Sequence, residues 1–428
     1  MKHVWIIVLE NEDYATTFGA KSPAPYLAKT LPSQGELLTH YYGTGHLSLD
    51  NYVTMVSGQP PNPQTQADCQ FYTDFAGSVG SDGVAVGQGC VFPPQVKTVA
   101  DQLEAKGLTW KGYMEDMGTA CNHPVLNQRD NTQSATKDSQ YAARHNPFVY
   151  FHSIIDRPIC NTNVVDLGAL QGDLAQASST PSYSFITPDL CHDGHDASCA
   201  DGGPGGLGAV NTFLQTWVPR ITGSPAYADG GLLIVTFDEA GSDSTSCCQE
   251  PTGPNSPNNG GTSQGSGGGR VGAVLLSRYV KPGSVNDTPY NHYSLLRSTE
   301  DLFGLPHLAY AAQVGLKPFE DDVFNKGSGG GGGGSTGSPG PKPRVTIKGV
   351  PKRCVRKPFT ARVKVKSKHL RRVNTMVDRR VVAHSAKHSF KVRVSAKGLR
   401  AGNHLFSVRA RDASKRTTRK TVRFRVCR

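Results

Sequence analysis

The sequence predicts a large α/β domain followed by a small all-β domain. Short β-branched runs alternate with helical patterns up to residue 326, and a stretch rich in Gly, Ser and Pro follows over 327–343. From residue 344 onward, apolar and cationic residues alternate. Alternating strands and helices are typical of a layered fold with a largely parallel sheet, whereas period-two alternation indicates strands with one buried face. We therefore predict domains over 1–326 and 344–428, joined by a linker.

The strands predicted for the first domain are the β-branched runs His3–Leu9, Thr109–Met114, Tyr183–Thr187, Leu232–Phe237 and Val271–Ser277. The predicted helices, which carry apolar residues at helical spacing, are Val99–Lys106, Leu207–Trp217 and Ser294–Gly304. In a parallel sheet, functional groups collect at the carboxyl ends of the strands. Candidate site residues are therefore expected just after these runs.

The second domain differs from the first in charge. Residues 1–340 carry 17 Lys and Arg against 32 Asp and Glu, a net charge of −15, whereas residues 341–428 carry 29 against 2, a net charge of +27. Alternation from Phe359, Phe390 and Val422 predicts an immunoglobulin-like β-sandwich with a cationic outer face. An anionic cell-envelope polymer or a membrane surface is the expected partner. The phenylalanines fall at core positions, which disfavours sequence-specific binding of nucleic acid.

A further helix is predicted from residue 48, because Leu49, Tyr52 or Val53, and Val56 recur at helical spacing. Ser48 then occupies the N-cap position, beside free backbone N–H groups and the positive end of the helix dipole. That environment stabilises a phosphate group, and a hydroxyl held there can attack one. Ser48 is therefore either an ordinary helix cap or a nucleophile.

Three of the predicted strands end in acidic residues. Glu10 and Asn11 follow the first strand, Asp189, His192, Asp193, His195 and Asp196 follow the strand Tyr183–Thr187, and Asp238 and Glu239 follow Leu232–Phe237. Parallel strands bring these ends to one edge, where clustered carboxylates repel each other unless a cation lies among them. Carboxylate, amide and imidazole ligands suit Mg²⁺, Ca²⁺, Mn²⁺, Fe²⁺ or Zn²⁺. The sequence thus predicts a site for one or two divalent metal ions.

These motifs resemble a known family. The segment from Ser48 through Asn51 to Gly58 is similar to the nucleophile motif of the alkaline phosphatase superfamily, where Thr or Ser precedes an apolar residue and Pro-Asn. With the three acidic strand ends, it resembles the bacterial phosphoesterases. That branch holds secreted acid phosphatases, phosphatidylinositol-phosphate phosphatases and phospholipases C. The resemblance covers roughly residues 3 to 325 and implies a three-layer, alkaline-phosphatase-like domain.

The resemblance also implies a role for each motif residue. Ser48 would be the nucleophile that becomes transiently phosphorylated, and Asn51 would hold a phosphoryl oxygen. The implied ligands of one metal ion are Glu10, Ser48, Asp238 and Glu239, with Asn11 adjacent. Those of a second ion, or of a phosphate pocket, are Asp189, His195 and His292. The spacing after Asp189 is longer than in the family pattern, which leaves Asp193 or His192 as an alternative ligand.

Histidines can protonate the departing oxygen at a pH near their pKa. His46, His192 and His195 are the candidates for this role. His123, His145 and His307 are expected to have ordinary structural roles. Asp50 stands where the family has the proline before its asparagine, a departure expected to loosen the turn.

The ten cysteines, without Cys-x-x-Cys spacing, predict disulfides and an exported protein. Cys354 with Cys427 and Cys191 with Cys199 are expected pairs, whereas the adjacent Cys247 and Cys248 are expected to bond to different partners. No apolar stretch is long enough to span a membrane, and the first apolar run is too short for a signal peptide. We expect either a mature form or a start upstream, and a secreted or cell-envelope-associated protein.

Together, the motifs predict metal-dependent hydrolysis of phosphate esters through a phosphoserine, by an exported acid phosphatase acting on monoesters. The expected substrate is a phosphorylated small molecule or a phospholipid headgroup. A phospholipase C-like phosphodiesterase and a non-catalytic surface protein that binds a phosphorylated ligand are the alternatives. A sulfatase is disfavoured, because the Cys/Ser-x-Pro-x-Arg motif of those enzymes is absent from the sequence.

Overall fold

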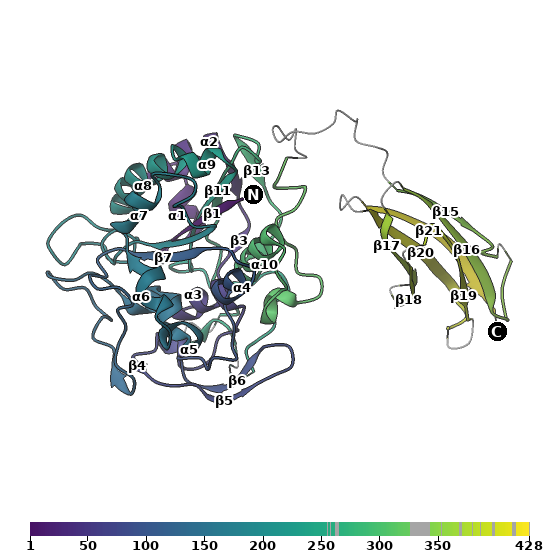
Figure 1. Cartoon of the computed structure of the whole chain (residues 1–428), viewed down its shortest axis with the longest axis horizontal. Coiled ribbons are helices and arrows are strands. Elements are labelled where there is room, and N and C mark those ends of the chain that lie inside the picture. Colours follow the sequence, from purple (N-terminus) through teal and green to yellow (C-terminus); the bar gives the residue numbers. More distant parts are fainter. Residues whose placement is uncertain are drawn as a thin grey trace. The chain divides into compact units, whose positions relative to one another are not determined.

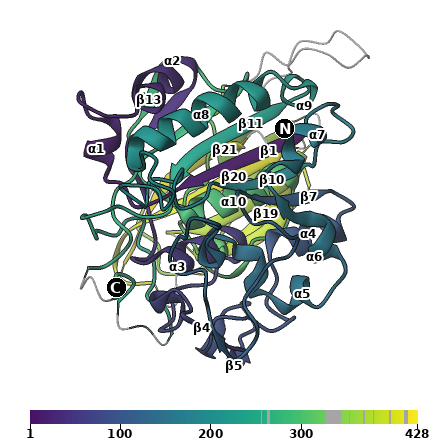
Figure 2. The same cartoon turned by 90° about the vertical axis from the view of Figure 1, so that its left-hand side faces the viewer.

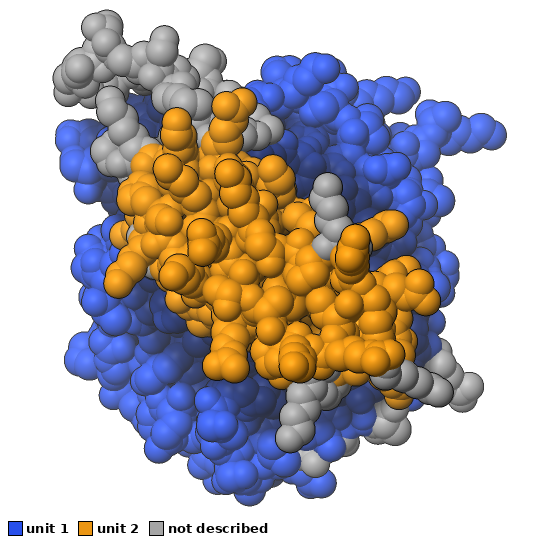
Figure 3. All heavy atoms as spheres, turned by 90° about the vertical axis from the view of Figure 1, so that its right-hand side faces the viewer, with its two compact units in different colours: residues 1–328 blue, residues 329–428 orange. Residues whose placement is uncertain are grey.

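The computed structural model of the chain forms two compact units, residues 1–328 and 329–428, which Figure 3 colours blue and orange and which are described separately below. The structure describes residues 1–254, 256, 258–261, 265–325, 343–351, 353–367, 370–378, 380–385, 387–395, 399–412 and 417–427. Apart from Pro343, the predicted linker 327–343 lies outside the described residues.

Unit 1 holds the N-terminus marked in Figure 1 and is built on an eight-stranded sheet. The strand order is β13-β2-β12-β11-β1-β10-β7-β9. The strands are β1 (His3–Leu9), β2 (Glu36–Leu38), β7 (Trp110–Met114), β9 (Val164–Asp166), β10 (Tyr183–Thr187), β11 (Gly231–Phe237), β12 (Ala273–Leu276) and β13 (Ser284–Asn286). The five strands from β11 to β9 run parallel, and β12 is antiparallel to its two neighbours. Every residue of β1 and β11 is buried, as expected for central strands covered on both faces.

Helices cover both faces of this sheet, which gives three layers (Figure 2). On one face lie α8 (Gly206–Thr222) and α9 (Pro225–Ala228). On the other face lie α3 (Ser48–Ser57), α4 (Val99–Ala105) and α10 (His292–Phe303). The predicted α/β class with a largely parallel sheet is confirmed.

The remaining elements of unit 1 are short. The helices are α1 (Tyr14–Phe18), α2 (Leu31–Gln34), α5 (His152–Ile155), α6 (Ile159–Asn163) and α7 (Ala169–Asp173), and the paired strands are β3 (Tyr41–Tyr42) with β14 (Tyr290–Asn291), β4 (Phe71–Tyr72) with β8 (Gln128–Arg129), and β5 (Ala76–Val79) with β6 (Ala85–Gln88). Two 3₁₀ turns, η3 (Ala143–His145) and η4 (Pro147–Tyr150), lie in the long connection between β8 and α5.

Unit 2 consists of two antiparallel sheets, which confirms the predicted all-β class. One has the order β15-β16-β19 and the other β18-β17-β20-β21. Their bounds are β15 (Arg344–Lys348), β16 (Phe359–Lys366), β17 (Leu370–Val377), β18 (Arg380–Ser385), β19 (Ser389–Val394), β20 (Gly402–Asp412) and β21 (Thr417–Val426). Alternate residues such as Val363, Val408 and Phe424 are buried in one shared core, as period-two alternation requires.

The cysteines form five disulfides. Cys191–Cys199 and Cys354–Cys427 pair as predicted, and Cys69–Cys90 and Cys121–Cys160 are further bonds. The prediction for Cys247 and Cys248 was wrong, because these neighbours are bonded to each other. An extended backbone would point adjacent side chains apart, but Cys248 has φ +63° and the chain turns there.

None of the described helices is long and apolar enough to cross a membrane.

Candidate active site

The site lies at the carboxyl ends of three neighbouring strands, β11, β1 and β10. Backbone hydrogen bonds join the segments that leave these strands. Asp238 N donates to Leu9 O at 2.9 Å, and Glu10 N donates to Asp193 O at 2.8 Å. The acidic strand ends therefore meet at one rim, as the sequence predicted for parallel strands.

Ser48 is the first residue of α3 and is buried at this rim. Its Oγ donates to Glu10 Oε2 at 2.8 Å. The predicted N-cap position was wrong, because Leu47 occupies it and no side-chain cap forms there. The helix start is instead satisfied from a distant segment, since Leu49 N donates to Asp68 Oδ1 at 2.9 Å. This arrangement leaves the Ser48 hydroxyl free to face Glu10.

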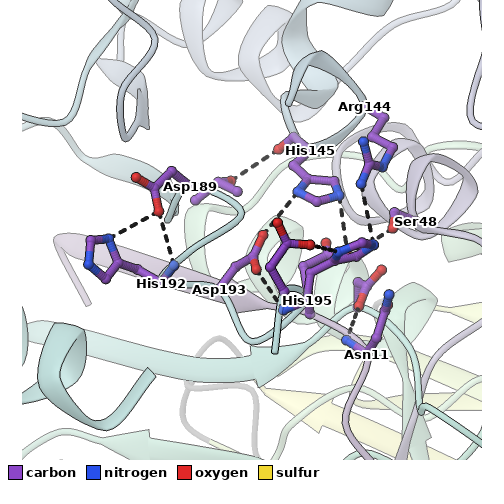
Figure 4. Close-up of polar contacts among 12 residues, drawn as sticks. Asn11, Ser48, Arg144, His145, Asp189, His192, Asp193 and His195 are labelled. Carbon is purple, nitrogen blue, oxygen red and sulfur yellow. Dashed lines mark hydrogen bonds and ion pairs between the residues drawn. The ribbon is translucent and has the colours of Figure 1, made fainter. Parts of the chain in front are cut away.

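His145 lies in the centre of the cluster, which corrects the expectation of an ordinary structural role (Figure 4). Its Nε2 is 3.3 Å from Glu10 Oε2, and its Nδ1 is 3.2 Å from Asp193 Oδ2. The ring stacks on Tyr52 of α3, with centroids 5.3 Å apart. No pattern in the sequence indicates this position of His145, because η3 lies in a long connection without periodicity.

Arg144 and His195 lie together beside Ser48, and the Arg144 guanidinium supplies positive charge there (Figure 4). Arg144 Nη2 lies 3.4 Å from His195 Nε2, and Arg144 Nε lies 3.8 Å from Asp68 Oδ2. His195 Nδ1 is 2.8 Å from Asp196 Oδ1, and its backbone N–H donates to Asp193 Oδ1. Arg144 is buried, whereas about a third of the His195 side chain is exposed, so solvent reaches the His195 imidazole. Sequence reasoning missed Arg144 and Asp68 as well as His145.

Asp238, Glu239, Asn11 and His46 form the other side of the cluster. Asn11 adopts a left-handed conformation with φ +52°, and its backbone N–H donates to Asp238 Oδ1 at 3.2 Å. With its amide nitrogen turned inward, Asn11 Nδ2 donates to Glu10 Oε2 and Glu239 Oε1. His46 Nδ1 lies 2.5 Å from Glu239 Oε2. His46 therefore contacts the carboxylates from the loop that precedes Ser48.

Burial dominates the electrostatics of the cluster. It raises the pKa of the Glu10, Asp193, Asp238 and Glu239 carboxyls above the ordinary value, and it lowers the pKa of His145. Glu10 further raises the pKa of Asp193, Asp238 and Glu239 by repulsion. Such a cluster is costly to ionise without a compensating positive charge.

The donor atoms at this rim fit a divalent cation. Glu10, His145 and Asp193 each offer one ligand atom, and these atoms lie within 4.8 Å of one another. Glu10 Oε1 and Asp238 Oδ2 are buried without a hydrogen-bond partner. Asp193 Oδ2 and Glu239 Oε2 contact the ring nitrogens of His145 and His46. Carboxylate oxygens beside an imidazole suit a hard or borderline ion. His145 thus joins the set of candidate ligands predicted from the sequence.

Asn51 differs from its predicted place on a phosphoryl oxygen. Its Oδ1 accepts hydrogen bonds from the backbone N–H groups of Thr44 and Gly45 at 2.8 and 3.0 Å. Its Nδ2 donates to Gly45 O and Leu47 O at 2.9 and 3.1 Å, which uses both amide hydrogens. Asn51 therefore holds the loop that carries His46 and Ser48, and it has no donor left for a substrate.

Asp189 and His192 lie away from Ser48, on the far side of Asp193 (Figure 4). Asp189 Oδ1 accepts from the backbone N–H groups of Cys191 and His192, which closes a turn. His192 Nδ1 lies 3.0 Å from Asp189 Oδ1 and 3.1 Å from Glu115 Oε2, and these contacts raise its pKa to about 10. Asp193 and His192 were the two alternative metal ligands predicted after β10. The structure places Asp193 in the cluster, whereas His192 points towards Glu115.

His292 also has a different environment from the predicted one. Its Nδ1 lies 3.0 Å from Tyr41 Oη, and its Nε2 lies 2.5 Å from the backbone oxygen of Asp238. Burial lowers the pKa of this histidine to about 4, so it is neutral. Both ring nitrogens are occupied by protein oxygens, and His292 supports the backbone of Asp238.

Asp50 is fully buried, and neither carboxylate oxygen has a hydrogen-bond partner. Burial raises its pKa well above the ordinary value, and repulsion by Glu239 raises it further. The turn was expected to be loose at this position, but Asn51 holds it with several hydrogen bonds. A Cβ atom at Gly45 would lie 2.1 Å from Asp50 Oδ1, so Asp50 fills the space that glycine leaves.

Comparison with known proteins identifies relatives of this chain. An acid phosphatase of Aspergillus fumigatus is 26% identical over 308 residues, which cover 71% of this chain and 55% of that protein. A phosphatidylinositol-3-phosphatase of Mycobacterium tuberculosis is 25% identical over 309 residues, which cover 72% and 79%. The chain spans just over half the length of the fungal acid phosphatases it matches.

A solved structure described as a protein in the alkaline phosphatase superfamily from Vibrio parahaemolyticus aligns with 98% of this chain and 82% of that chain, at 12% identity and a TM-score of 0.44. The Phosphoesterase family matches residues 24–306, which include Ser48, His145, Asp193 and Asp238. This match agrees with the resemblance seen in the sequence motifs. The chain belongs to the phosphoesterase family.

Proposed function

We propose that unit 1 hydrolyses phosphate monoesters, as an acid phosphatase does, with Ser48 as the nucleophile. The observation that carries the proposal is the 2.8 Å hydrogen bond from Ser48 Oγ to Glu10, inside a buried cluster of acidic residues. A serine hydroxyl needs a nearby base or a metal ion to become a nucleophile. Glu10 is such a base, and the residues around it would hold such an ion. Relatives described as acid phosphatases support the reaction class.

The residues that would hold a divalent ion are Glu10, His145, Asp193, Asp238 and Glu239, because their carboxylate and imidazole atoms converge on one rim. When bound, the ion would neutralise negative charge on the phosphoryl group and lower the pKa of the attacking hydroxyl. Asn11 would orient two of these carboxylates through its side-chain amide.

The remaining residues would bind the phosphoryl group and move protons. Glu10 Oε2 is the acceptor within reach of the Ser48 proton. Arg144 would attract phosphoryl oxygens, since its guanidinium lies beside His195 with a buried stem. His195, held by Asp196 through Nδ1, would protonate the departing oxygen through Nε2, and its partial exposure lets it exchange the proton with solvent. His46 is the second candidate for this role.

The test compares hydrolysis of an aryl phosphate monoester and a bis-aryl phosphate diester, with and without a chelator. We expect faster turnover of the monoester, and loss of activity in the chelator with recovery on adding a divalent ion. Ser48→Ala should lose about 10³-fold or more in kcat. Ser57→Ala is the matched control, because Ser57 lies in the same helix and its hydroxyl bonds only within that region.

Three outcomes would contradict the proposal, one each for the nucleophile, the preference for monoesters and catalysis itself. Full activity of Ser48→Ala would exclude the serine nucleophile. Preference for the diester would favour the phospholipase C-like alternative. Binding of inorganic phosphate without turnover of either substrate would favour a surface protein that binds phosphorylated ligands.

We further propose an exported protein whose unit 2 attaches it to an anionic surface. Five disulfides are typical of proteins that fold in an oxidising compartment. The net charge of +27 over residues 341–428 supports attraction to polyanions. A phosphorylated small molecule or a phospholipid headgroup is the proposed substrate, the second in line with the relative described as a phosphatidylinositol-3-phosphatase.

A further inference from the structure

The outer face of the four-stranded sheet in unit 2 carries a dense group of arginines. On β17, β20 and β21, alternate residues point away from the core, and strand pairing places Arg372 opposite Arg411, and Arg409 opposite Arg419. Like charges directly opposite each other destabilise a sheet. Opposed arginine pairs occur on both strand pairs, β17 with β20 and β20 with β21, and an anionic ligand bound to this face would offset their mutual repulsion.

Three of these arginines enclose a hollow of a size that suits a phosphate group. The hollow is lined by Arg372, Asn374, Arg409 and Arg411 and has a volume of about 120 Å³. His384 Nδ1 lies 2.9 Å from Asn374 Oδ1 and 3.3 Å from Arg372 Nη2 at one wall of the hollow, so it either donates to the amide oxygen or accepts from the guanidinium. Guanidinium groups in a fixed arrangement bind phosphate oxygens with paired hydrogen bonds.

The same face ends in exposed apolar side chains. Val381 pairs with Met376, and the side chains of Val381 and Leu405 are 48% and 38% exposed. The backbone N–H of Leu405 donates to Asp378 Oδ1 at 3.0 Å, and the other oxygen of this carboxylate lies 2.8 Å from His404 Nδ1. Arg423 lies opposite Leu405 on the neighbouring strand. Apolar groups beside arginines on one face are typical of surfaces that contact lipid. The cations are attracted to anionic headgroups, and the apolar side chains enter the boundary between headgroups and acyl chains.

The three-stranded sheet provides an internal comparison. Its outer face is also cationic, with Arg362, Lys364, Lys366 and Lys391 exposed. None of the large exposed apolar residues of the described part of the chain lies on β15, β16 or β19. Charge alone therefore does not distinguish the outer faces of the two sheets. The four-stranded sheet differs from the three-stranded one in its arginine-lined hollow and in the exposed Val381 and Leu405.

We propose that the outer face of the sheet β18-β17-β20-β21 docks onto an anionic phospholipid surface. The hollow between Arg372, Arg409 and Arg411 receives a lipid phosphate, and Val381 and Leu405 contact the interfacial region. This inference rests on the proposed attachment of unit 2 to an anionic surface, and it names the face and the ligand. It is independent of the chemistry at Ser48.

The test measures co-sedimentation of the full chain with vesicles of phosphatidylcholine alone and of phosphatidylcholine with phosphatidylglycerol, at physiological salt. The variant Arg372→Gln/Arg409→Gln/Arg411→Gln is compared with Lys364→Gln/Lys366→Gln/Lys391→Gln, which removes the same charge from the other face. A cation near an anionic membrane contributes on the order of 1 kcal/mol, so we expect the arginine variant to bind at least about tenfold more weakly. The lysine variant should lose less than about threefold, as expected for cations away from the surface.

A second pair of measurements separates lipid from a soluble polyanion. Val381→Ser/Leu405→Ser should weaken binding to the anionic vesicles and leave binding to soluble polyphosphate unchanged. Equal losses in the two charge variants would overturn the proposal. It would also be overturned if polyphosphate bound as tightly as vesicles and the apolar variant had no effect, because the ligand would then be a linear polyanion.

Two controls complete the experiment. Far-ultraviolet circular dichroism of each variant checks that unit 2 is folded, and Arg409→Gln alone replaces the triple variant if that variant unfolds. Turnover of the soluble aryl phosphate should be unchanged in all variants, since unit 2 contributes no residue to the Ser48 cluster. Vesicle binding without any turnover would contradict the proposed catalysis and support the docking surface.

Discussion

Ser48 Oγ and His145 Nε2 both approach the same atom, Glu10 Oε2, at 2.8 and 3.3 Å. Glu10 thereby links the predicted nucleophile to a histidine that lies about a hundred residues further along the chain. Asp193, on the opposite ring nitrogen of His145, connects this pair to the loop after β10. At the scale of single residues, contacts among the side chains of Ser48, Glu10, His145 and Asp193 define the site.

His145→Ala tests this assignment. The substitution removes a ring held between two buried carboxylates, so we expect activity to fall at least about 100-fold and the affinity for a divalent ion to fall about tenfold or more. Activity is measured on the aryl monoester across a titration of metal ion, and affinity by calorimetry. His307→Ala, at a partly exposed histidine that contacts Asp301, is the control. Unchanged metal affinity in His145→Ala would remove His145 from the ligand set.

Gly45→Ala probes the packing of the nucleophile loop. The added methyl group would meet Asp50 Oδ1 at 2.1 Å, and Asp50 is fully buried, so neither group has room to move. We expect Gly45→Ala to lower the free energy of unfolding by about 1–3 kcal/mol, as overpacking does. Adding Asp50→Ala removes the carboxylate and should restore part of this loss.

Urea unfolding of the two single variants and the double variant gives the coupling energy between residues 45 and 50. Additive effects would show that the loop relaxes away from Asp50.

At the scale of elements, α10 supports the site from one end and carries a buried acid along its length. His292 at its start contacts the backbone of Asp238, and Glu300 near its end accepts a hydrogen bond from Leu308 N at 2.8 Å. Burial raises the pKa of Glu300 to about 8, against an ordinary value of 4.5. The folded protein therefore holds a proton on Glu300 at a pH where the unfolded chain has released it.

This difference predicts a pH dependence of stability. Between pH 4.5 and 8 the folded state binds more protons, so the free energy of unfolding falls as the pH rises through this range and levels off above it. Glu300→Gln keeps an oxygen for Leu308 N and cannot ionise. At pH 9 we expect this variant to be more stable than the wild type by about 5 kcal/mol, the linkage free energy for pKa values of about 8 and 4.5, with little difference at pH 4.

The measurement can be confined to unit 1, because all three tryptophans, Trp5, Trp110 and Trp217, lie there. Urea unfolding followed by tryptophan fluorescence at several pH values gives the two stability curves. Parallel curves for the wild type and Glu300→Gln would exclude this ionisation as the cause.

At the scale of the whole molecule, two units of opposite charge are joined in one chain. Residues 1–340 have a net charge of −15, and residues 341–428 have a net charge of +27. Each unit has a separate hydrophobic core. The site residues discussed above all belong to unit 1.

Ending the chain at residue 328 separates the two activities that we assign. The shortened protein should hydrolyse the soluble aryl monoester within about twofold of the full chain, since none of the site residues is removed. It should no longer be retained on a phosphocellulose column at low salt, because the net charge changes from +12 to −15. Retention of the shortened protein would show that unit 1 binds the anionic matrix by itself.

The sequence by itself determined the fold class, the main strands and the rim on which the acidic residues meet. Strands such as His3–Leu9 and Tyr183–Thr187 were predicted with the bounds that the structure shows, because buried β-branched runs are a local property of the sequence. Parallel direction then brings Glu10 and Asp238 to one edge. The motif around Ser48 added the resemblance to the phosphoesterases.

Only the tertiary structure decided how the site is completed. His145 and Arg144 reach Glu10 and His195 from a long connection without periodicity, so no local pattern predicts their direction. Asn51 was expected on the substrate but is saturated by the backbone of its own loop. Asp68, and not Ser48, satisfies the start of α3. Contacts between residues far apart in the chain depend on how the connections pack over the sheet, which residue spacing does not encode.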